Sequence, residues 1–166
     1  MVNILVLCTG NSARSIIAEA LLNHIGAGQV SAYSAGSSPT GTPNPFALRV
    51  LKDNGLEIAH ARSKSWHEFS GEDAPVMDIV ITVCANAAGE VCPVWPGHPA
   101  TAHWGVADPA AISGTETEIS AAFLACYCAL KARIEAFFDG DFDSQTAYMR
   151  ARQIERDFGD TARIIA

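Results

Sequence analysis

Residues 2–15, VNILVLCTGNSARS, decide the fold class of this chain. Residues 2–7 form a nearly continuous apolar run rich in Val, Ile and Leu, which is typical of a strand buried on both faces of a parallel sheet. Small and polar residues follow at 8–12. A helical pattern then begins at about Ala13 and ends near Gly26 and Gly28, where a C-cap is expected. The stretch therefore predicts a buried strand, a short loop and a helix.

The same alternation of strands and helices continues along the chain. Strands are predicted over residues 30–35, 79–83 and 101–104, and helices over residues 44–54, 64–69, 115–138 and 144–158. The helix over 115–138 carries an apolar stripe at helical spacing, formed by Ile119, Phe123, Cys126, Leu130, Ile134 and Phe137. Strands that alternate with helices predict an α/β sandwich around a parallel sheet.

The composition excludes several classes of protein. The 166 residues are 49% hydrophobic and 17% charged, which fits one folded domain. A formal charge of −7 disfavours nucleic acid and anionic membranes as partners. The longest uninterrupted apolar run, residues 121–130, is too short to cross a bilayer, and no export signal is seen. Five cysteines are too few for a secreted disulfide framework, so we expect a cytoplasmic protein with reduced thiols.

The loop after the first strand carries a nucleophile, an arginine and a serine in the pattern Cys8-x5-Arg14-Ser15. A loop that enters a helix N-terminus directs backbone N–H groups into one concavity, and the helix dipole adds positive potential there. Such a cradle fits an oxyanion of phosphate size, which Arg14 can clamp with a bidentate fork. The same field, and a hydrogen bond from Ser15, would favour Cys8 as a nucleophilic thiolate. The alternative interpretation is a buried cysteine at a strand end with an incidental arginine.

Residues of the loop have separate expected roles. Gly10 permits unusual backbone angles, and Asn11 tolerates the left-handed region better than most residues. The oxyanion is expected to bind to the residues of the loop itself, namely Thr9, Gly10, Asn11, Ser12, Ala13 and Arg14.

Three segments together resemble a known family. LCTGNSARS with the following AEAL, YSAG at 33–36 and HWGVADPA at 103–110 are similar to the low-molecular-weight phosphotyrosine phosphatase superfamily, and especially to its thioredoxin-coupled arsenate reductases. The resemblance implies a three-layer sandwich with a four-stranded parallel sheet in the flavodoxin-like order. It covers residues 1–138 as a catalytic domain. Residues 139–166 are expected to be a C-terminal extension, with an extra helix that packs on the domain or on a partner.

The resemblance assigns Asp108 as the general acid that protonates the leaving oxygen. Its structural alternative is a turn-capping Asp before Pro109. Tyrosine phosphatases of the superfamily typically carry an aromatic residue just after this Asp-Pro pair, where Ala110 and Ala111 stand here. Small residues at this point favour an inorganic anion such as arsenate over an aryl phosphate. A phosphatase acting on phosphotyrosine or small aryl phosphates remains the second hypothesis, and an anion-binding or redox-sensing module without turnover is the third.

Cys84 and Cys92 complete the resemblance to the arsenate reductases. They imply a relay in which Cys84 attacks Cys8, releases arsenite and passes the disulfide to Cys92 for reduction by thioredoxin or glutaredoxin. An external thiol reductant would then suffice, with no cofactor and no metal. Two alternatives remain, namely passive buried cysteines, or a zinc site that adds His98 and His103 to this pair.

Some members of the superfamily bind potassium near the loop. Asn11, Glu19 and Ser34 match three of its ligands, but Lys64 stands where the fourth, an aspartate, is expected. We therefore expect no potassium, and an ammonium group in its place. Cys126 is expected in the core, and Cys128 has no assigned role.

Overall fold

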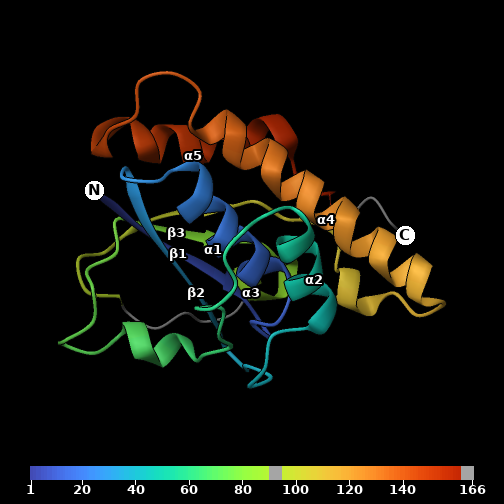
Figure 1. Cartoon of the computed structure of the whole chain (residues 1–166). Helices are drawn as coiled ribbons and strands as arrows, with labels where there is room; N and C mark the ends of the chain where they lie inside the picture. Colours follow the sequence, from blue (N-terminus) through green and yellow to red (C-terminus); the bar gives the residue numbers. More distant parts are fainter. Residues whose placement is uncertain (90–94, 162–166) are drawn as a thin grey trace.

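The computed structural model describes residues 1–89 and 95–161. The elements, in chain order, are β1 Val2–Cys8, α1 Arg14–Ile25, β2 Val30–Gly36, α2 Pro45–Asp53, the 3-10 helix η1 Trp66–Phe69, β3 Ile79–Thr82, α3 Ala85–Gly89, β4 Ala100–His103, the 3-10 helix η2 Pro109–Ala111, α4 Glu116–Phe137 and α5 Ser144–Phe158. Figure 1 traces them from blue at the N-terminus to red at the C-terminal helix. The predicted α/β fold with an extra C-terminal helix is confirmed.

The four strands form one parallel sheet in the order β2-β1-β3-β4, which is the predicted flavodoxin-like order. In its register, Cys8 lies beside Gly36, and Leu7 lies beside Thr82. Thr82 in turn lies beside His103 of β4. Because the carboxyl ends of parallel strands meet at one edge, the segments that follow β1, β3 and β4 gather there.

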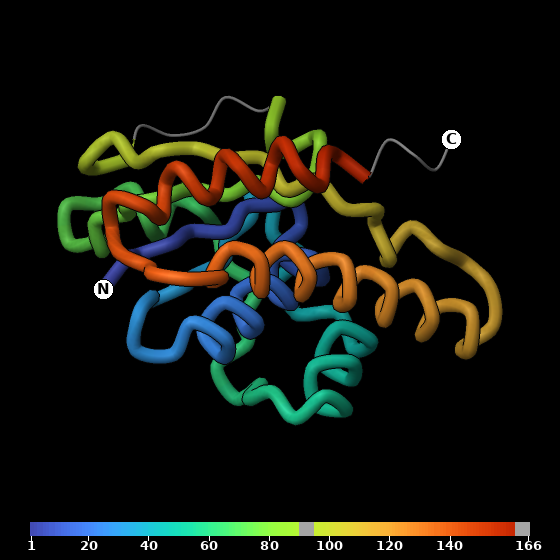
Figure 2. The backbone as a smooth tube through the Cα atoms, turned by 90° about the horizontal axis from the view of Figure 1, so that it is seen from above, coloured from blue at the N-terminus to red at the C-terminus, as the bar shows by residue number. Residues whose placement is uncertain are grey.

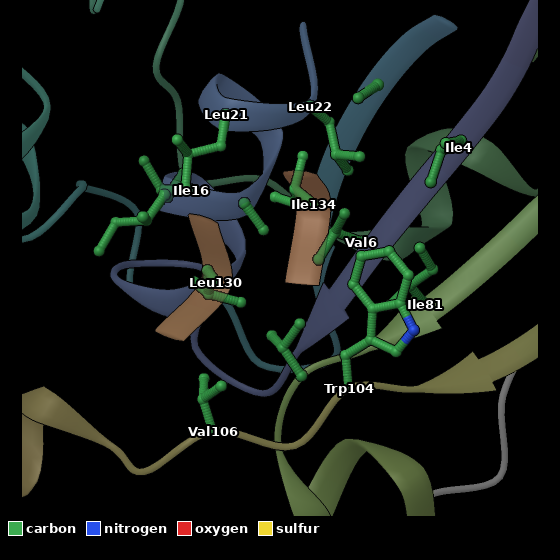
Figure 3. Packing of buried hydrophobic residues seen from close by; sticks show 14 of the residues in the cluster. Ile4, Val6, Ile16, Leu21, Leu22, Ile81, Trp104, Val106, Leu130 and Ile134 are labelled. Carbon is green, nitrogen blue, oxygen red and sulfur yellow. The ribbon is translucent and has the colours of Figure 1, made fainter. Parts of the chain in front are cut away.

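The central strand β1 is buried on both faces, as its apolar run predicted. Alternate residues belong to two separate cores: Ile4 and Val6 pack with the helices, whereas Leu5 and Leu7 pack with Trp66 on the other face. Figure 3 shows the first core, where side chains of α1 and α4 meet those of the sheet. The second face is covered by η1 and adjoining segments, so the third layer of the sandwich is thin.

Helix α4 begins at a capping box, in which Thr115 and Glu118 satisfy each other's backbone N–H groups. Helix α5 then doubles back along α4, as Figure 2 shows. Its buried residues Ala147, Ala151 and Ile154 join the first core, and the indole Nε1 of Trp104 donates to the carbonyl of Ala151 at 2.9 Å. Within residues 1–89 and 95–161, no helix combines the length and apolarity that a membrane span requires.

Candidate active site

The loop between β1 and α1 has its carbonyl groups turned outward. The carbonyls of Thr9, Gly10 and Ser12 accept hydrogen bonds of 2.8–3.0 Å from the N–H groups of residues 38, 40 and 44. Because each peptide unit is planar and points its N–H opposite to its C=O, the N–H groups that follow these carbonyls face the inside of the loop. Together with the N-terminus of α1, these N–H groups give the loop the geometry that the predicted anion cradle requires.

Two residues allow this loop to close. Asn11 has φ 43°, in the left-handed region, which asparagine adopts more readily than most residues. At Gly36, on the neighbouring strand, a Cβ atom would collide with the Thr9 carbonyl. A glycine at that position therefore lets β2 run close beside the loop.

The Cys8 sulfur is buried and surrounded by hydrogen-bond donors. Its Sγ lies 2.9 Å from Ser15 Oγ and accepts the N–H of Asn11 at 3.2 Å. Burial raises the pKa of the Cys8 thiol, and the neighbouring Cys84 adds to that rise, whereas the hydrogen bonds from Ser15 and Asn11 lower it. The net direction is upward, because the loss of hydration outweighs these hydrogen bonds. The expectation that the loop favours the Cys8 thiolate stays a prediction.

A buried hydrogen-bond network connects the cradle to Lys64. The Asn11 side chain donates 2.9 Å bonds from Nδ2 to Ser15 Oγ and to Ser34 Oγ, and Ser34 donates to Glu19. The Lys64 Nζ lies 3.3 Å from Glu19 Oε2, and the Lys64 backbone N–H donates to Asn11 Oδ1 at 2.7 Å. Burial raises the pKa of Glu19, and the Lys64 ammonium opposes that rise.

Arg14 and Asp108 face each other across the mouth of the cradle. Arg14 Nη2 lies 2.8 Å from Asp108 Oδ2, and its Nη1 donates to the Val106 carbonyl at 3.2 Å. Asp108 Oδ1 also accepts the N–H of Ala110 at 3.0 Å. The carboxylate therefore caps η2, as its structural interpretation predicted, and at the same time lies beside the predicted catalytic loop. An oxyanion in the cradle would compete with Asp108 for the Arg14 fork.

Cys84 lies close to this loop, at the end of β3. Its Sγ accepts the N–H of Ala87 at 3.3 Å and lies 3.7 Å from the hydroxyl of Thr9. The sequence predicted no helix between the strands over residues 79–83 and 101–104, but residues 85–89 form the short helix α3. The alanine-rich run there was the signal that could have predicted it. No sequence signal pointed to Thr9 as a neighbour of Cys84, because their proximity comes from the pairing of β1 with β3.

The other predicted site residues are placed as follows. Cys92 lies outside the described residues. Cys126 is buried in the first core, and burial raises its pKa to about 12; Cys128 is exposed. The zinc alternative gains no support. His103 Nδ1 lies 2.8 Å from Thr82 Oγ1, and no group of three or more His, Cys, Asp or Glu residues in the described part of the chain could hold a metal ion.

Comparison with known proteins agrees with this geometry. The family model for low molecular weight phosphotyrosine protein phosphatase matches residues 3–154. The chain belongs to this family. Relatives within it include proteins named arsenate reductase. One from Shouchella clausii is 37% identical over 131 residues, which are 79% of this chain and 91% of the relative. One from Bacillus subtilis is 38% identical over 112 residues, which are 68% of this chain and 77% of the relative.

Solved structures of the phosphatase family share the fold. A structure described as an arsenate reductase in the phosphate binding state has a TM-score of 0.61 at 26% identity, and the match covers 81% of this chain and 95% of that one. The tyrosine phosphatase Wzb from Escherichia coli K30, in complex with sulphate, has a TM-score of 0.60 at 25% identity, covering 80% and 96%. An arsenate reductase and a tyrosine phosphatase thus both occur on this fold.

Proposed function

We propose that the protein is an arsenate reductase that works through a relay of three thiols. One observation carries the proposal: Cys8 ends β1, and Cys84 lies two residues beyond the end of the neighbouring strand β3, with both thiols buried and the Thr9 hydroxyl 3.7 Å from the Cys84 sulfur. A phosphatase needs only the first of these thiols, whereas a reductase needs a second that can reach it. The names of the relatives support the same choice.

The first step is the attack of Cys8 on arsenate in the cradle. The Cys8 thiol proton can pass to a bound hydrogen arsenate dianion, which gives the Cys8 thiolate and a dihydrogen arsenate monoanion. The total charge and the number of protons in the site do not change in this transfer. The oxyanion replaces Asp108 on the Arg14 fork, and Asp108 takes up a proton from solvent. The sulfur then forms an S–As bond, and Asp108 gives this proton to the departing hydroxyl, which leaves as water. Arg14 and the inward N–H groups stabilise the oxyanion throughout. Arsenic remains As(V) in this intermediate.

The second step is the reduction itself. Cys84 attacks the Cys8 sulfur, the S–As bond breaks, and its electron pair stays on arsenic, which leaves as arsenite after taking up protons. A Cys8–Cys84 disulfide remains. The N–H of Ala87 and the hydroxyl of Thr9 can both stay in contact with the attacking sulfur. Two electrons have then passed from the thiols to arsenic.

The last steps restore the thiols. Cys92 attacks Cys84, frees the Cys8 thiolate and forms a Cys84–Cys92 disulfide. A thiol partner such as thioredoxin or glutaredoxin then reduces this bond, so the electrons come from outside the chain. No cofactor is needed within it.

The potassium site of some family members does not fit these residues. The Lys64 ammonium already donates to Glu19, which removes the need for a second cation there. A potassium ion beside it would meet like charge at short range. We expect the reductase to work equally well in sodium and potassium salts.

The alternative function is hydrolysis of aryl phosphates through a Cys8 phosphoenzyme. The same Cys8, Arg14 and Asp108 would serve it, and the fold is shared with a tyrosine phosphatase. The alanines at 110 and 111 leave no aromatic side chain to pack on a substrate ring.

Turnover in the presence of thioredoxin separates the two functions. Arsenite release is measured for the wild type, for Cys84→Ser and for Cys128→Ser, which changes an exposed cysteine. A reductase loses arsenite release in Cys84→Ser alone. A phosphatase releases no arsenite in any of the three, and its hydrolysis of an aryl phosphate is unaffected by Cys84→Ser.

A further inference from the structure

The end of α5 lies against the segment that leads to Asp108. The carbonyl of Gly105 accepts the backbone N–H of Thr161 at 3.1 Å and the Thr161 hydroxyl at 3.2 Å. Gly105 lies three residues before Asp108. The predicted C-terminal extension therefore contacts the segment that carries the general acid, although the two are more than fifty residues apart in the sequence.

A buried arginine joins these two parts of the chain to α4. Arg133 is only 2% exposed, and its Nη2 lies 3.2 Å from the Gly105 carbonyl, 3.3 Å from the Gly159 carbonyl and 3.4 Å from Thr161 Oγ1. Its guanidinium also lies over the ring of Phe158, at 5.1 Å from the centroid. Burial lowers the pKa of Arg133, and the charge of Asp160 opposes that effect. Burying a charge is costly unless hydrogen bonds compensate it, and three oxygen atoms lie within hydrogen-bond distance of Arg133 Nη2.

Asp160 fits closely against the same segment. Its Oδ2 lies 3.3 Å from His103 Nε2, and a Cβ atom on Gly105 would collide with its carboxylate. His103 ends β4, and Thr82 Oγ1 lies 2.8 Å from its other ring nitrogen. Through His103, Asp160 therefore connects the C-terminal extension to strands β4 and β3 of the sheet.

Side-chain packing holds the segment before Asp108 in place, but the exposed Asp108 side chain is not itself packed in the core. Trp104 and Val106 point into the first core, as Figure 3 shows, and hold the segment up to Val106. Beyond it, residues 107–109, 111 and 112 line a mainly apolar cavity of about 560 Å³ between this segment and α4, and Thr161 lines the same cavity. A cavity provides few contacts to resist movement. The hydrogen bonds at Gly105 add to the anchoring of Trp104 and Val106, and together with the Arg14 contacts to Val106 and Asp108 they fix the path of the chain to Asp108.

We propose that Arg133, Asp160 and Thr161 are positioning residues for the general acid. They act through Gly105 and hold the segment 103–108 in the orientation that places Asp108 beside Arg14 and the cradle. The C-terminal extension is then a working part of the active site. This inference rests on the proposed function, because it assumes that Asp108 supplies the proton.

The first test does not depend on the reaction. Backbone hydrogen–deuterium exchange is measured on the full chain for the wild type, for Asp160→Ala combined with Thr161→Val, and for Asp157→Asn as a control on the exposed face of α5. We expect faster exchange over residues 103–108 in the double variant alone. If that variant unfolds, Gly105→Ala disturbs the same contact from the other side and serves instead. Unchanged exchange over these residues would overturn the proposal.

The second test is a mutant cycle with Asp108. The double variant should lower kcat for arsenate reduction about tenfold with KM unchanged, because a misplaced acid slows the chemical step more than binding. In an Asp108→Asn background the same two changes should have no further effect. An equal fall in both backgrounds would mean a general structural role and would sink the proposal. If the wild type itself reduces no arsenate, the proposed function fails, and the exchange experiment still decides whether the contact orders the segment.

Discussion

Replacing Ser15 with alanine tests the hydrogen-bond network around the nucleophile. The Asn11 amide donates to Ser15 Oγ at 2.9 Å, and its orientation is fixed because its oxygen accepts the Lys64 backbone N–H. Ser15 therefore has its own hydroxyl hydrogen available for the Cys8 sulfur, 2.9 Å away. Ser15→Ala removes the one side-chain donor in this network that reaches the sulfur, while the Asn11 N–H remains.

The size of the effect follows from the character of this bond. A hydrogen bond to a charged group contributes about 1.5–3 kcal/mol, and every 1.4 kcal/mol is a factor of ten in an equilibrium. Burial already raises the pKa of Cys8 and Ser15 lowers it, so the variant raises it further. The thiolate fraction at neutral pH should therefore fall by roughly ten- to a hundredfold, and the pH profile of thiolate formation should move to higher pH.

Alkylation by iodoacetamide, followed by mass spectrometry from pH 6 to 10, measures this thiolate fraction directly. The exposed Cys128 in the same sample serves as an internal reference. Ser12→Ala is the matched control, since it changes a serine of the same loop whose hydroxyl makes no hydrogen bond to Cys8 among the described residues. If Ser15→Ala folds normally and its Cys8 is alkylated at the same rate as in the wild type, the conclusion that the Ser15 hydroxyl donates to the Cys8 sulfur is refuted.

Three further predictions concern the acid, the buried cation and the arginine. Asp108→Asn should lower kcat for arsenate reduction by about a hundredfold or more, measured as arsenite release, because proton transfer to the leaving oxygen is lost. Lys64→Met should destabilise the fold by about 3 kcal/mol in urea at pH 8, and Glu19→Gln should recover part of this loss. Because the pKa of Glu19 is raised in the fold and rises further without Lys64, the destabilisation should shrink as the pH falls towards 5. Arg14→Lys should raise KM for arsenate and lower kcat, since a lysine cannot form the bidentate clamp.

Much of the fold could be predicted because local patterns agree with tertiary contacts. The strand over residues 2–7, the helix over residues 115–138 and the helix over residues 144–158 all appear as expected. The boundaries of α2 follow from Asn44 and Asn54, which cap its two ends. The Asp-Pro pair predicts either a cap or an acid, and the Asp108 carboxylate occupies a position compatible with both.

The rest depends on contacts that no local pattern encodes. Arg133 lies next to the apolar stripe of α4, and an arginine in such a helix is normally assigned to the solvent side. Its burial depends on Gly105 and Gly159, which come from two distant segments. The raised pKa of Cys8 likewise comes from the depth of the sulfur rather than from the loop sequence. These features arise only when β1, β4 and α5 are assembled.

A single turnover in the absence of any reductant tests the central claim most directly. Fully reduced protein is mixed with arsenate, arsenite is counted per chain, and disulfides are mapped in the wild type and in Cys92→Ser. The relay predicts one arsenite per chain, with a Cys84–Cys92 disulfide in the wild type and a trapped Cys8–Cys84 disulfide in the variant. No arsenite, or arsenite released without either disulfide, would contradict it.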